Sequence, residues 1–331
     1  MLYGYKASAE QFGTKDLLDY AVAADQLGYD LVAVSDHFQT WRHHGGHAPL
    51  VFSWLGAAAV KTERAMLSTS VLTPIMRYHP SIVAQGFATL AQLAPGRILM
   101  GVGTGEAMNE TPATGDPFPG GRERRARLHE AIDLIRALWS DERVTHDGRY
   151  YQTQMATIYE RPDAHIPIYL AAGGPLAGKL AGRIADGMIA TSGKPDEVYT
   201  NVLAGEREGA AAADRDHEPA LQLEVKVSYA RDIETARTDC DWWAPLGLPA
   251  DIKQNVHDPI EMERLADAEP GMAQKRFIVS DDPDEVVERV SRYVDLGFTE
   301  LVFHGPGPDQ QRFLAEFASD VLPRLRDTFG D

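Results

Sequence analysis

Eight short apolar runs, rich in residues that favour β-strands, recur along the chain and alternate with longer amphipathic segments. The expected strands cover residues 2–8, 31–36, 65–72, 98–103, 166–172, 187–192, 221–230 and 300–305. Alternation of strands and helices predicts an α/β fold with a parallel sheet. Eight such units indicate a (β/α)8 TIM barrel, although a doubly wound open sheet is compatible with the same alternation.

The segment 14–28 shows the pattern expected of the helices between the strands. Leu17 and Ala21 are four residues apart, so they fall on one apolar face of a helix. Thr14 is expected to cap the start of this helix, and Gly28 is expected to end it.

The chain is longer than a minimal barrel. A (β/α)8 barrel typically needs about 250 residues, whereas this chain has 331. The surplus fits two insertions. One is a hairpin around residues 143–154 that turns at Asp147 and Gly148, and the other covers residues 239–276, before the last strand. No repeat of fixed period and no linker-like stretch is present, so we expect a single barrel domain over residues 1–331.

The charge balance limits the partners. The chain has 32 basic and 49 acidic residues and a net charge of −17, which argues against nucleic acid, because phosphate backbones require a basic field. A small anion needs only a local basic pocket. The single cysteine, Cys240, excludes a disulfide framework and a Cys-rich metal site. The sequence has no membrane-spanning apolar run and its start lacks a signal core, so we expect a cytoplasmic protein without a membrane partner.

Polar residues and glycines collect where the expected strands end. Asp36 and His37 follow the second strand, Ser70 follows the third and His304 ends the last. The stretches "GVGTGEAMNE", "AAGGP" and "TSGK" follow the fourth, fifth and sixth strands. Because the carboxyl ends of barrel strands meet at one face, which carries the active site of TIM-barrel enzymes, we expect a shared site there.

A histidine-rich loop follows the second strand. His43, His44 and His47 have no regular helical spacing, and two glycines separate the last from the others. The sequence also has no H-E-x-x-H motif. We interpret the three histidines as solvated loop residues and expect no metal.

His37 differs, because it lies directly at a strand end. Imidazole titrates near neutral pH, so His37 can serve as a general acid or base; a hydrogen-bonded core histidine is the alternative. Asp36 could orient the ring, although neighbouring side chains on a strand point to opposite faces. Trp41 is either a core residue or a platform over a flat ligand.

The stretch "GVGTGEAMNE" (101–110) is not the dinucleotide fingerprint G-x-G-x-x-G. Its glycines let a ligand approach the backbone closely, and Glu106 adds a carboxylate, unless it merely caps a helix. Gly173 and Gly174 precede an expected helix start, which is a generic anion site. Lys194 adds a cation at the next strand end or is a solvated lysine.

Taken together, these motifs closely resemble the F420-dependent glucose-6-phosphate dehydrogenases, which belong to the luciferase-like superfamily of (β/α)8 barrels. The more specific stretches are "KASAEQF", "SDHFQTWRHHGGHAP" and "WWAPL", and the similarity runs from Tyr3 to about Arg326. In that family a sugar phosphate gives a hydride from its anomeric carbon to coenzyme F420. The resemblance therefore implies an oxidoreductase that forms 6-phosphogluconolactone and reduced F420, and it implies a homodimer.

The resemblance also implies roles for individual residues. His37 and Glu106 correspond to the catalytic pair, with the division of acid and base work left open, and Trp41 to the tryptophan at the reacting ring. Cofactor contacts are implied for Asp36, Ser70, Val71, Thr73, Thr104, Gly105, Asn109, Gly173 and Gly174, with a cis peptide between Ser70 and Val71. The substrate-binding residues implied are Glu10 and a phosphate set of Lys194, Lys253 and Arg276.

Two stretches depart from the family pattern. Gln254 replaces a histidine after Lys253, and the stretch "TPATGDPFPGG" (111–121) is altered. Both are expected to border the substrate pocket, so we expect tolerance of other hexose 6-phosphates such as mannose 6-phosphate. The alternatives are another F420- or FMN-dependent luciferase-like oxidoreductase and a non-catalytic deazaflavin-binding barrel.

Overall fold

The computed structural model describes residues 1–216, 218–269 and 271–330. Within these ranges eight parallel strands close into a barrel, because β8 pairs with both β7 and β9. The barrel strands are β1 (Leu2–Ala7), β2 (Leu31–Val34), β3 (Met66–Thr69), β4 (Ile98–Val102), β7 (Ile168–Ala171), β8 (Gly187–Thr191), β9 (Ala220–Tyr229) and β11 (Glu300–His304). The TIM-barrel prediction is confirmed, and the open sheet is excluded.

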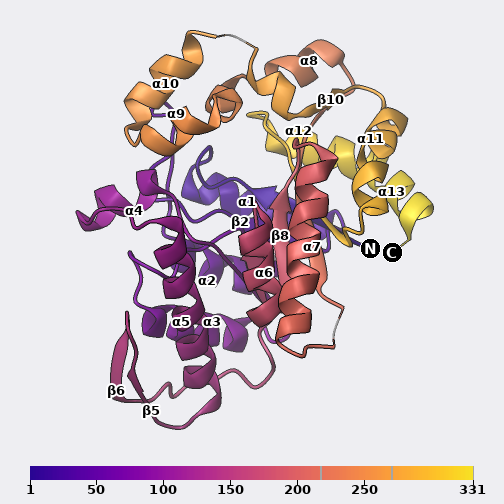
Figure 1. Cartoon of the computed structure of the whole chain (residues 1–331). Coiled ribbons are helices and arrows are strands. Elements are labelled where there is room, and N and C mark those ends of the chain that lie inside the picture. The colour runs from indigo at the N-terminus through magenta and orange to yellow at the C-terminus, as the bar shows by residue number, and fades with distance from the viewer. Residues whose placement is uncertain (217, 270, 331) are drawn as a thin grey trace.

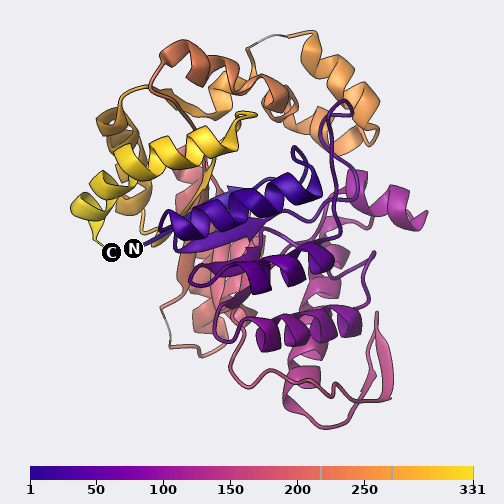
Figure 2. The same cartoon turned by 180° about the vertical axis from the view of Figure 1, so that it is seen from behind.

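Helices cover the outside of the barrel (Figures 1 and 2). They are α1 (Thr14–Gln26), α2 (Val51–Lys61), α3 (Pro80–Leu93), α4 (Ala107–Thr114), α5 (Gly121–Ser140), α6 (Pro175–Ile184), α7 (Asp196–Ala212), α8 (Ile233–Thr238), α11 (Pro283–Asp295), α12 (Gln310–Asp320) and α13 (Leu322–Phe329). Large side chains such as Trp54, Phe87 and Phe317 are fully buried in one core between these helices and the strands. Among the described residues, no helix combines the length and the apolar character that crossing a membrane requires.

Helix α1 corrects one expectation. Its first residue is Thr14, and the cap position belongs to Gly13, whose carbonyl accepts the first helical hydrogen bond from Leu17 N at 2.9 Å. The prediction that Thr14 caps the helix was wrong, because the extended backbone of Gly13 already provides the entry into the first turn. Gly28 does follow the end of the helix, with a positive φ of 88° that glycine adopts without strain.

Helices α6 and α7 approach each other unusually closely through glycines. A Cβ atom on Gly178 would lie 2.2 Å from Val202 O, and one on Gly182 would lie 1.9 Å from Glu206 O. Only glycine fits at such positions, because any side chain would collide with the backbone of the neighbouring helix. Since α6 follows β7 and α7 follows β8, this helix pair also holds the two strands side by side.

The two extra segments lie at opposite ends of the molecule (Figure 1). At one end, β5 (Val144–Asp147) and β6 (Gln152–Ala156) form an antiparallel hairpin. Its connecting loop spans residues 148–151, so it is longer than the expected two-residue turn at Asp147 and Gly148.

The second extra segment covers the end of the barrel where the strands terminate. It contains η1 (Asp241–Gly247), α9 (Ala250–Asn255), α10 (Pro259–Asp267) and η2 (Ala273–Arg276), followed by β10 (Ile278–Ser280), a strand the sequence did not predict. β10 extends the sheet by pairing with β9. Arg42, in the loop after β2, makes ion pairs of 3.2 Å with Glu263 and 2.8 Å with Asp267, so this loop and the insertion are joined.

Candidate active site

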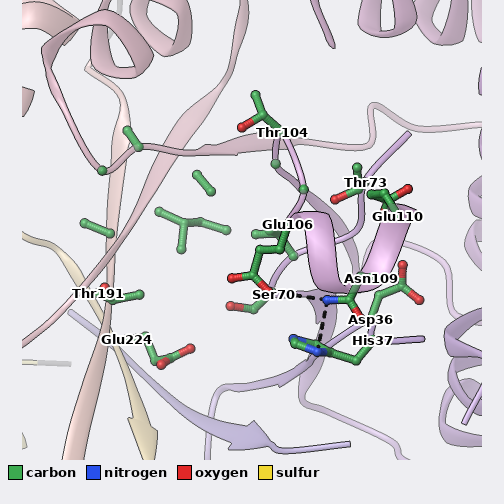
Figure 3. A pocket seen from close by; sticks show the side chains of 18 of the residues that line it. Asp36, His37, Ser70, Thr73, Thr104, Glu106, Asn109, Glu110, Thr191 and Glu224 are labelled. Carbon is green, nitrogen blue, oxygen red and sulfur yellow. Dashed lines mark hydrogen bonds between the residues drawn. The ribbon is translucent and has the colours of Figure 1, made fainter. Parts of the chain in front are cut away.

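Two cavities meet at the carboxyl ends of the barrel strands. An inner cavity of about 300 Å³ lies against β3, β4, β7 and β8. An outer cavity of about 790 Å³ lies between the strand ends and the insertion. Eight residues line both: His37, Ser70, Gly105, Glu106, Gly173, Thr191, Lys194 and Glu224. Figure 3 shows side chains that line the inner cavity, including His37, Ser70, Glu106, Thr191 and Glu224 of this shared set.

The walls of the inner cavity suit a flat ligand with polar edges. Small residues form much of the lining, namely Gly103, Gly105, Ala171, Ala172 and Gly173. Of the implied cofactor contacts, Asp36, Ser70, Val71, Thr73, Thr104, Gly105, Asn109 and Gly173 line this cavity, and the Ser70–Val71 peptide is cis. Gly174 lies just beyond the lining, directly before the first residue of α6. The small residues and polar groups that line this cavity therefore fit a group of the size of a deazaflavin.

Asp36 is held by one cation and one hydroxyl group, both from the segment between β3 and α3. Its Oδ2 lies 2.9 Å from Nη2 of Arg77, and the hydroxyl of Tyr78 donates to its Oδ1 at 3.1 Å. Nε of the same arginine lies 2.9 Å from Oε1 of Glu110 on α4. The idea that Asp36 orients His37 was wrong, because Asp36 is paired with Arg77 and Tyr78, while His37 finds other partners. Arg77 thus joins the loop after β2 to α4.

His37 has three polar neighbours. Its Nε2 lies 3.2 Å from Oε1 of Glu10, its Nδ1 lies 2.9 Å from the carbonyl oxygen of Gln39, and Asn109 Nδ2 is 3.2 Å from the same Nδ1. Burial alone would raise the pKa of Glu10, but the charges of His37 and Lys6 lower it below its ordinary value. An ionised carboxylate therefore stands beside the imidazole.

The pKa of Glu106 is shifted in the opposite direction to that of Glu10. Its side chain opens onto both cavities, yet the surrounding protein raises its pKa by burial, and the charge of Glu10 adds to this increase. Asn109 Nδ2 donates to Glu106 Oε2 at 3.3 Å (Figure 3). The Oδ1 of Asn109 accepts from the backbone N–H groups of Phe38 and Gln39. Asn109 therefore ties Glu106 to the loop that carries His37.

Trp41 stands over the outer cavity, which it lines together with His37 and Trp243. The ring centroids of Trp41 and His37 are 6.2 Å apart and the rings are tilted by 54°. The indole is partly buried and packs against side chains of the insertion. Trp41 is therefore a packing residue that also forms a wall of the outer cavity, and its role as a platform over a flat ligand stays a prediction.

The three expected phosphate ligands all line the outer cavity, although they come from three separate segments. None of them pairs with a carboxylate within the described part of the chain; Lys253 Nζ donates only to the carbonyl of Leu246, at 2.9 Å, and Arg276 Nε has no hydrogen-bond partner. Burial, together with neighbouring cations, lowers the pKa of Lys253 to about 8 and also lowers the pKa of Lys194. An anion would relieve this repulsion.

Comparison with known proteins places the chain. The model of the luciferase-like monooxygenase family matches residues 3–300. The chain belongs to this family. The relatives that this luciferase-like chain resembles in sequence include proteins named F420-dependent glucose-6-phosphate dehydrogenase. The one from Beutenbergia cavernae is 58% identical over 98% of this chain and 97% of its own length, and the one from Mycobacterium tuberculosis is 53% identical over 98% and 97%.

A solved structure also resembles this luciferase-like chain throughout. It is an F420-dependent secondary alcohol dehydrogenase in complex with an F420-acetone adduct, 33% identical, with a TM-score of 0.91 over 98% of this chain and 99% of that one. The F420-dependent tetrahydromethanopterin reductase from Methanopyrus kandleri, 22% identical with a TM-score of 0.80, shares the fold.

Several residues of this luciferase-like site escaped the sequence analysis. They are Lys6, Arg77, Glu110, Phe118, Glu224 and Lys226. The stretch "LQLEVKVSYA" held a usable signal, since Glu224 and Lys226 alternate with apolar residues and therefore share the face that points into the barrel. Phe118 lies in the altered stretch 111–121, which does border the outer cavity. The side chain of Gln254 lies outside the described part of the structure.

The loop histidines have no metal-like arrangement. Among the described residues, no group of three or more His, Cys, Asp or Glu side chains could hold a metal ion. His44 instead lies against the insertion, with Nδ1 3.0 Å from Oε2 of Glu263, and the backbone N–H of His47 donates to Glu10 O at 2.9 Å. This loop therefore connects the insertion to the segment that carries Glu10.

Proposed function

We propose that the protein oxidises the anomeric carbon of a hexose 6-phosphate and passes the hydride to coenzyme F420, with glucose 6-phosphate as the first candidate. The products are 6-phosphogluconolactone and reduced F420. The observation that carries the proposal is the set of Lys194, Lys253 and Arg276, which have no carboxylate partner in the described part of the chain and face the same cavity as His37 and Glu106. The names of the relatives from B. cavernae and M. tuberculosis support the same activity.

F420 supplies the hydride acceptor when it is bound; the protein supplies position and proton handling. The inner cavity would hold the deazaflavin through the small residues of β4 and β7 and the polar groups of Thr73, Thr104 and Asn109. The outer cavity would hold the sugar phosphate. The phosphate would lie on Lys194, Lys253 and Arg276, and C1 of the sugar would lie near His37. Both ligands then meet where the two cavities share their walls.

His37 is the better base of the catalytic pair. When the neutral ring carries its proton on Nδ1, this N–H donates to the carbonyl of Gln39, and the lone pair of Nε2, on the side of Glu10, can take the proton of the C1 hydroxyl. The ionised carboxylate of Glu10, 3.2 Å from Nε2, then stabilises the imidazolium. As the hydride leaves C1, the C–O bond gains double-bond character and the lactone forms.

Glu106 is the better acid. Its raised pKa keeps a proton on the carboxyl to higher pH than an ordinary glutamate would. Asn109 fixes one of its oxygens and thereby aims the group at the boundary between the cavities. Trp41 closes the outer cavity over the reacting end and helps to exclude water.

The setting of the enzyme is also part of the proposal: a cytoplasmic homodimer. The family resemblance supports the dimer, and the single buried cysteine suits a reducing compartment. Light scattering coupled to size exclusion measures the oligomeric state, and a monomer at micromolar concentration would remove that part.

The direct test is F420 reduction, followed by absorbance, with hexose 6-phosphates and the corresponding free sugars. We expect turnover with glucose 6-phosphate, much weaker turnover with glucose, and negligible activity when NAD, NADP or FMN replaces F420. Calorimetric titration with glucose 6-phosphate gives a second readout that does not need turnover. Efficient reduction of a nicotinamide cofactor, or equal use of glucose and its phosphate, would refute the proposal.

A further inference from the structure

Glu224 is a carboxylate of the site that the mechanism above does not use. Among the described residues that line the outer cavity, the carboxylates are Glu10, Glu106 and Glu224. The first two belong to the reacting end. Glu224 comes from β9 and lines the inner cavity as well. In Figure 3 its carboxylate enters the cavity from the side opposite the loop that carries His37.

The carboxylate of Glu224 is fixed and charged. Nζ of Lys226 donates to its Oε1 at 2.9 Å, Nζ of Lys6 lies 3.4 Å from its Oε2, and Nδ1 of His304 lies 3.8 Å from Oε1. Burial would raise its pKa, but Lys226 and Lys6 hold that pKa well below the ordinary value. A carboxylate has about four acceptor positions, so these contacts leave capacity for further O–H donors.

The position of Glu224 lies between the two ends of the outer cavity. On one side, the backbone N–H of Ser192, two residues before Lys194, donates to Glu224 O at 2.8 Å. On the other side, its carboxylate partner Lys6 lies on β1, four residues before Glu10. A hexose 6-phosphate carries its phosphate on C6 and reacts at C1, so the hydroxyls on the intervening ring carbons must pass between these ends.

We propose that Glu224 binds ring hydroxyl groups of the sugar and thereby selects among hexose 6-phosphates that share the same phosphate and the same reacting carbon. This inference rests on the proposed function and adds the basis of sugar selectivity to it. Sites built to bind a substrate hydroxyl discriminate strongly against analogues without it, because a buried polar group is then left unpaired. Lys6 and Lys226 are positioning residues that keep the acceptor in place.

The first experiment compares two ligands in the whole protein by calorimetric titration. Glu224→Gln removes a negative charge near Lys194, so inorganic phosphate should bind equally well or more tightly. Glucose 6-phosphate should bind at least about tenfold more weakly, because the charge-assisted hydroxyl contacts are lost. If Glu224 is only a counter-ion for the two lysines, both ligands will change together, and the inference fails.

Glu300→Gln is the matched control. Glu300 is a half-buried carboxylate of the barrel and accepts hydrogen bonds of 2.9 Å from Tyr169 and Gln222, but it lines neither cavity. Its substitution should leave both titrations unchanged. If it weakens glucose 6-phosphate as much as Glu224→Gln does, the effect comes from general disturbance of the barrel, and the inference fails.

The second experiment includes a comparison in the unmodified protein that can refute the inference without any variant. The values of kcat/KM are compared for glucose 6-phosphate, its 2-deoxy and 3-deoxy analogues, and galactose 6-phosphate, the C4 epimer. At least one analogue should lose about 100-fold, and Glu224→Gln should reduce that ratio at least tenfold. Equal turnover of all four overturns the inference even if the variant fails to fold. Absence of turnover with every sugar phosphate refutes the proposed function instead, and the titrations then still decide whether Glu224 contacts hydroxyls.

Discussion

The two ends of the outer cavity differ in whether their ionisable groups have partners within the protein. At the reacting end, the imidazole of His37 lies 3.2 Å from the carboxylate of Glu10, so each of these groups has a partner within the protein. At the phosphate end, Lys194, Lys253 and Arg276 face the cavity with no carboxylate partner among the described residues. The first end is complete without a ligand, whereas the second needs an anion. The difference suggests that one end is preorganised for chemistry and the other for capture.

The largest expected effect lies at the reacting end. His37→Ala and Glu106→Gln should each lower kcat at least about 100-fold, because general acid–base groups typically contribute 10²–10⁴. The Kd of F420, measured by fluorescence titration, should change much less, since neither side chain forms most of the inner cavity. A near-normal kcat for His37→Ala at every pH would make this histidine a structural residue and remove the contrast.

The next effect lies at the capture end. Arg276→Ala or Lys253→Ala should raise the KM for glucose 6-phosphate about 10–100-fold, because losing one partner of a desolvated charge pair costs about 2–5 kcal/mol, with partial exposure favouring the lower part. The Kd of F420 should stay nearly constant. Arg264→Ala is the control, since this exposed arginine pairs with Glu261 and lies outside the outer cavity. Equal losses for sugar phosphate and F420 would move these cations to the cofactor.

The pH dependence sharpens the comparison further. The pKa of Lys253 is lowered to about 8, so its positive charge is present below that pH and is lost above it. We therefore expect kcat/KM for glucose 6-phosphate, which reports the free enzyme, to fall as the pH rises through about 8. Lys253→Arg should move this fall to higher pH, because arginine stays charged. An identical profile in that variant would assign the fall to Glu106 or another group.

The smallest effect concerns the contact between the two ends. Arg42 joins the loop that carries His37 to the insertion that carries Lys253, through Glu263 and Asp267. Such partly exposed ion pairs contribute about 0–1 kcal/mol, so Arg42→Ala should raise the KM for the sugar phosphate by up to about fivefold and leave kcat nearly unchanged. A large loss of kcat would show that the insertion also orders the reacting end.

The sequence predicted the barrel because strands buried on both faces appear as short apolar runs, and eight such runs are hard to arrange otherwise. It did not single out Lys6 and Glu224, which lie inside two of the expected strands, because only the closed interior of the barrel brings these two charges together. It also could not link Asp36 to Arg77, since no local pattern reports a contact between residues 41 positions apart. The three-residue strand β10 is too short to leave a periodic signal.

The glycine contacts between α6 and α7 reach further than packing. The first of these helices begins beside Gly173 on the wall of the inner cavity, and the second begins just after Lys194 at the capture end. Backbones that meet at glycine distance cannot slide without losing contact, so the wall at Gly173 and the cation of Lys194 are set at one fixed separation. The helix pair, rather than the insertion, therefore fixes how far the proposed cofactor wall lies from the proposed phosphate end.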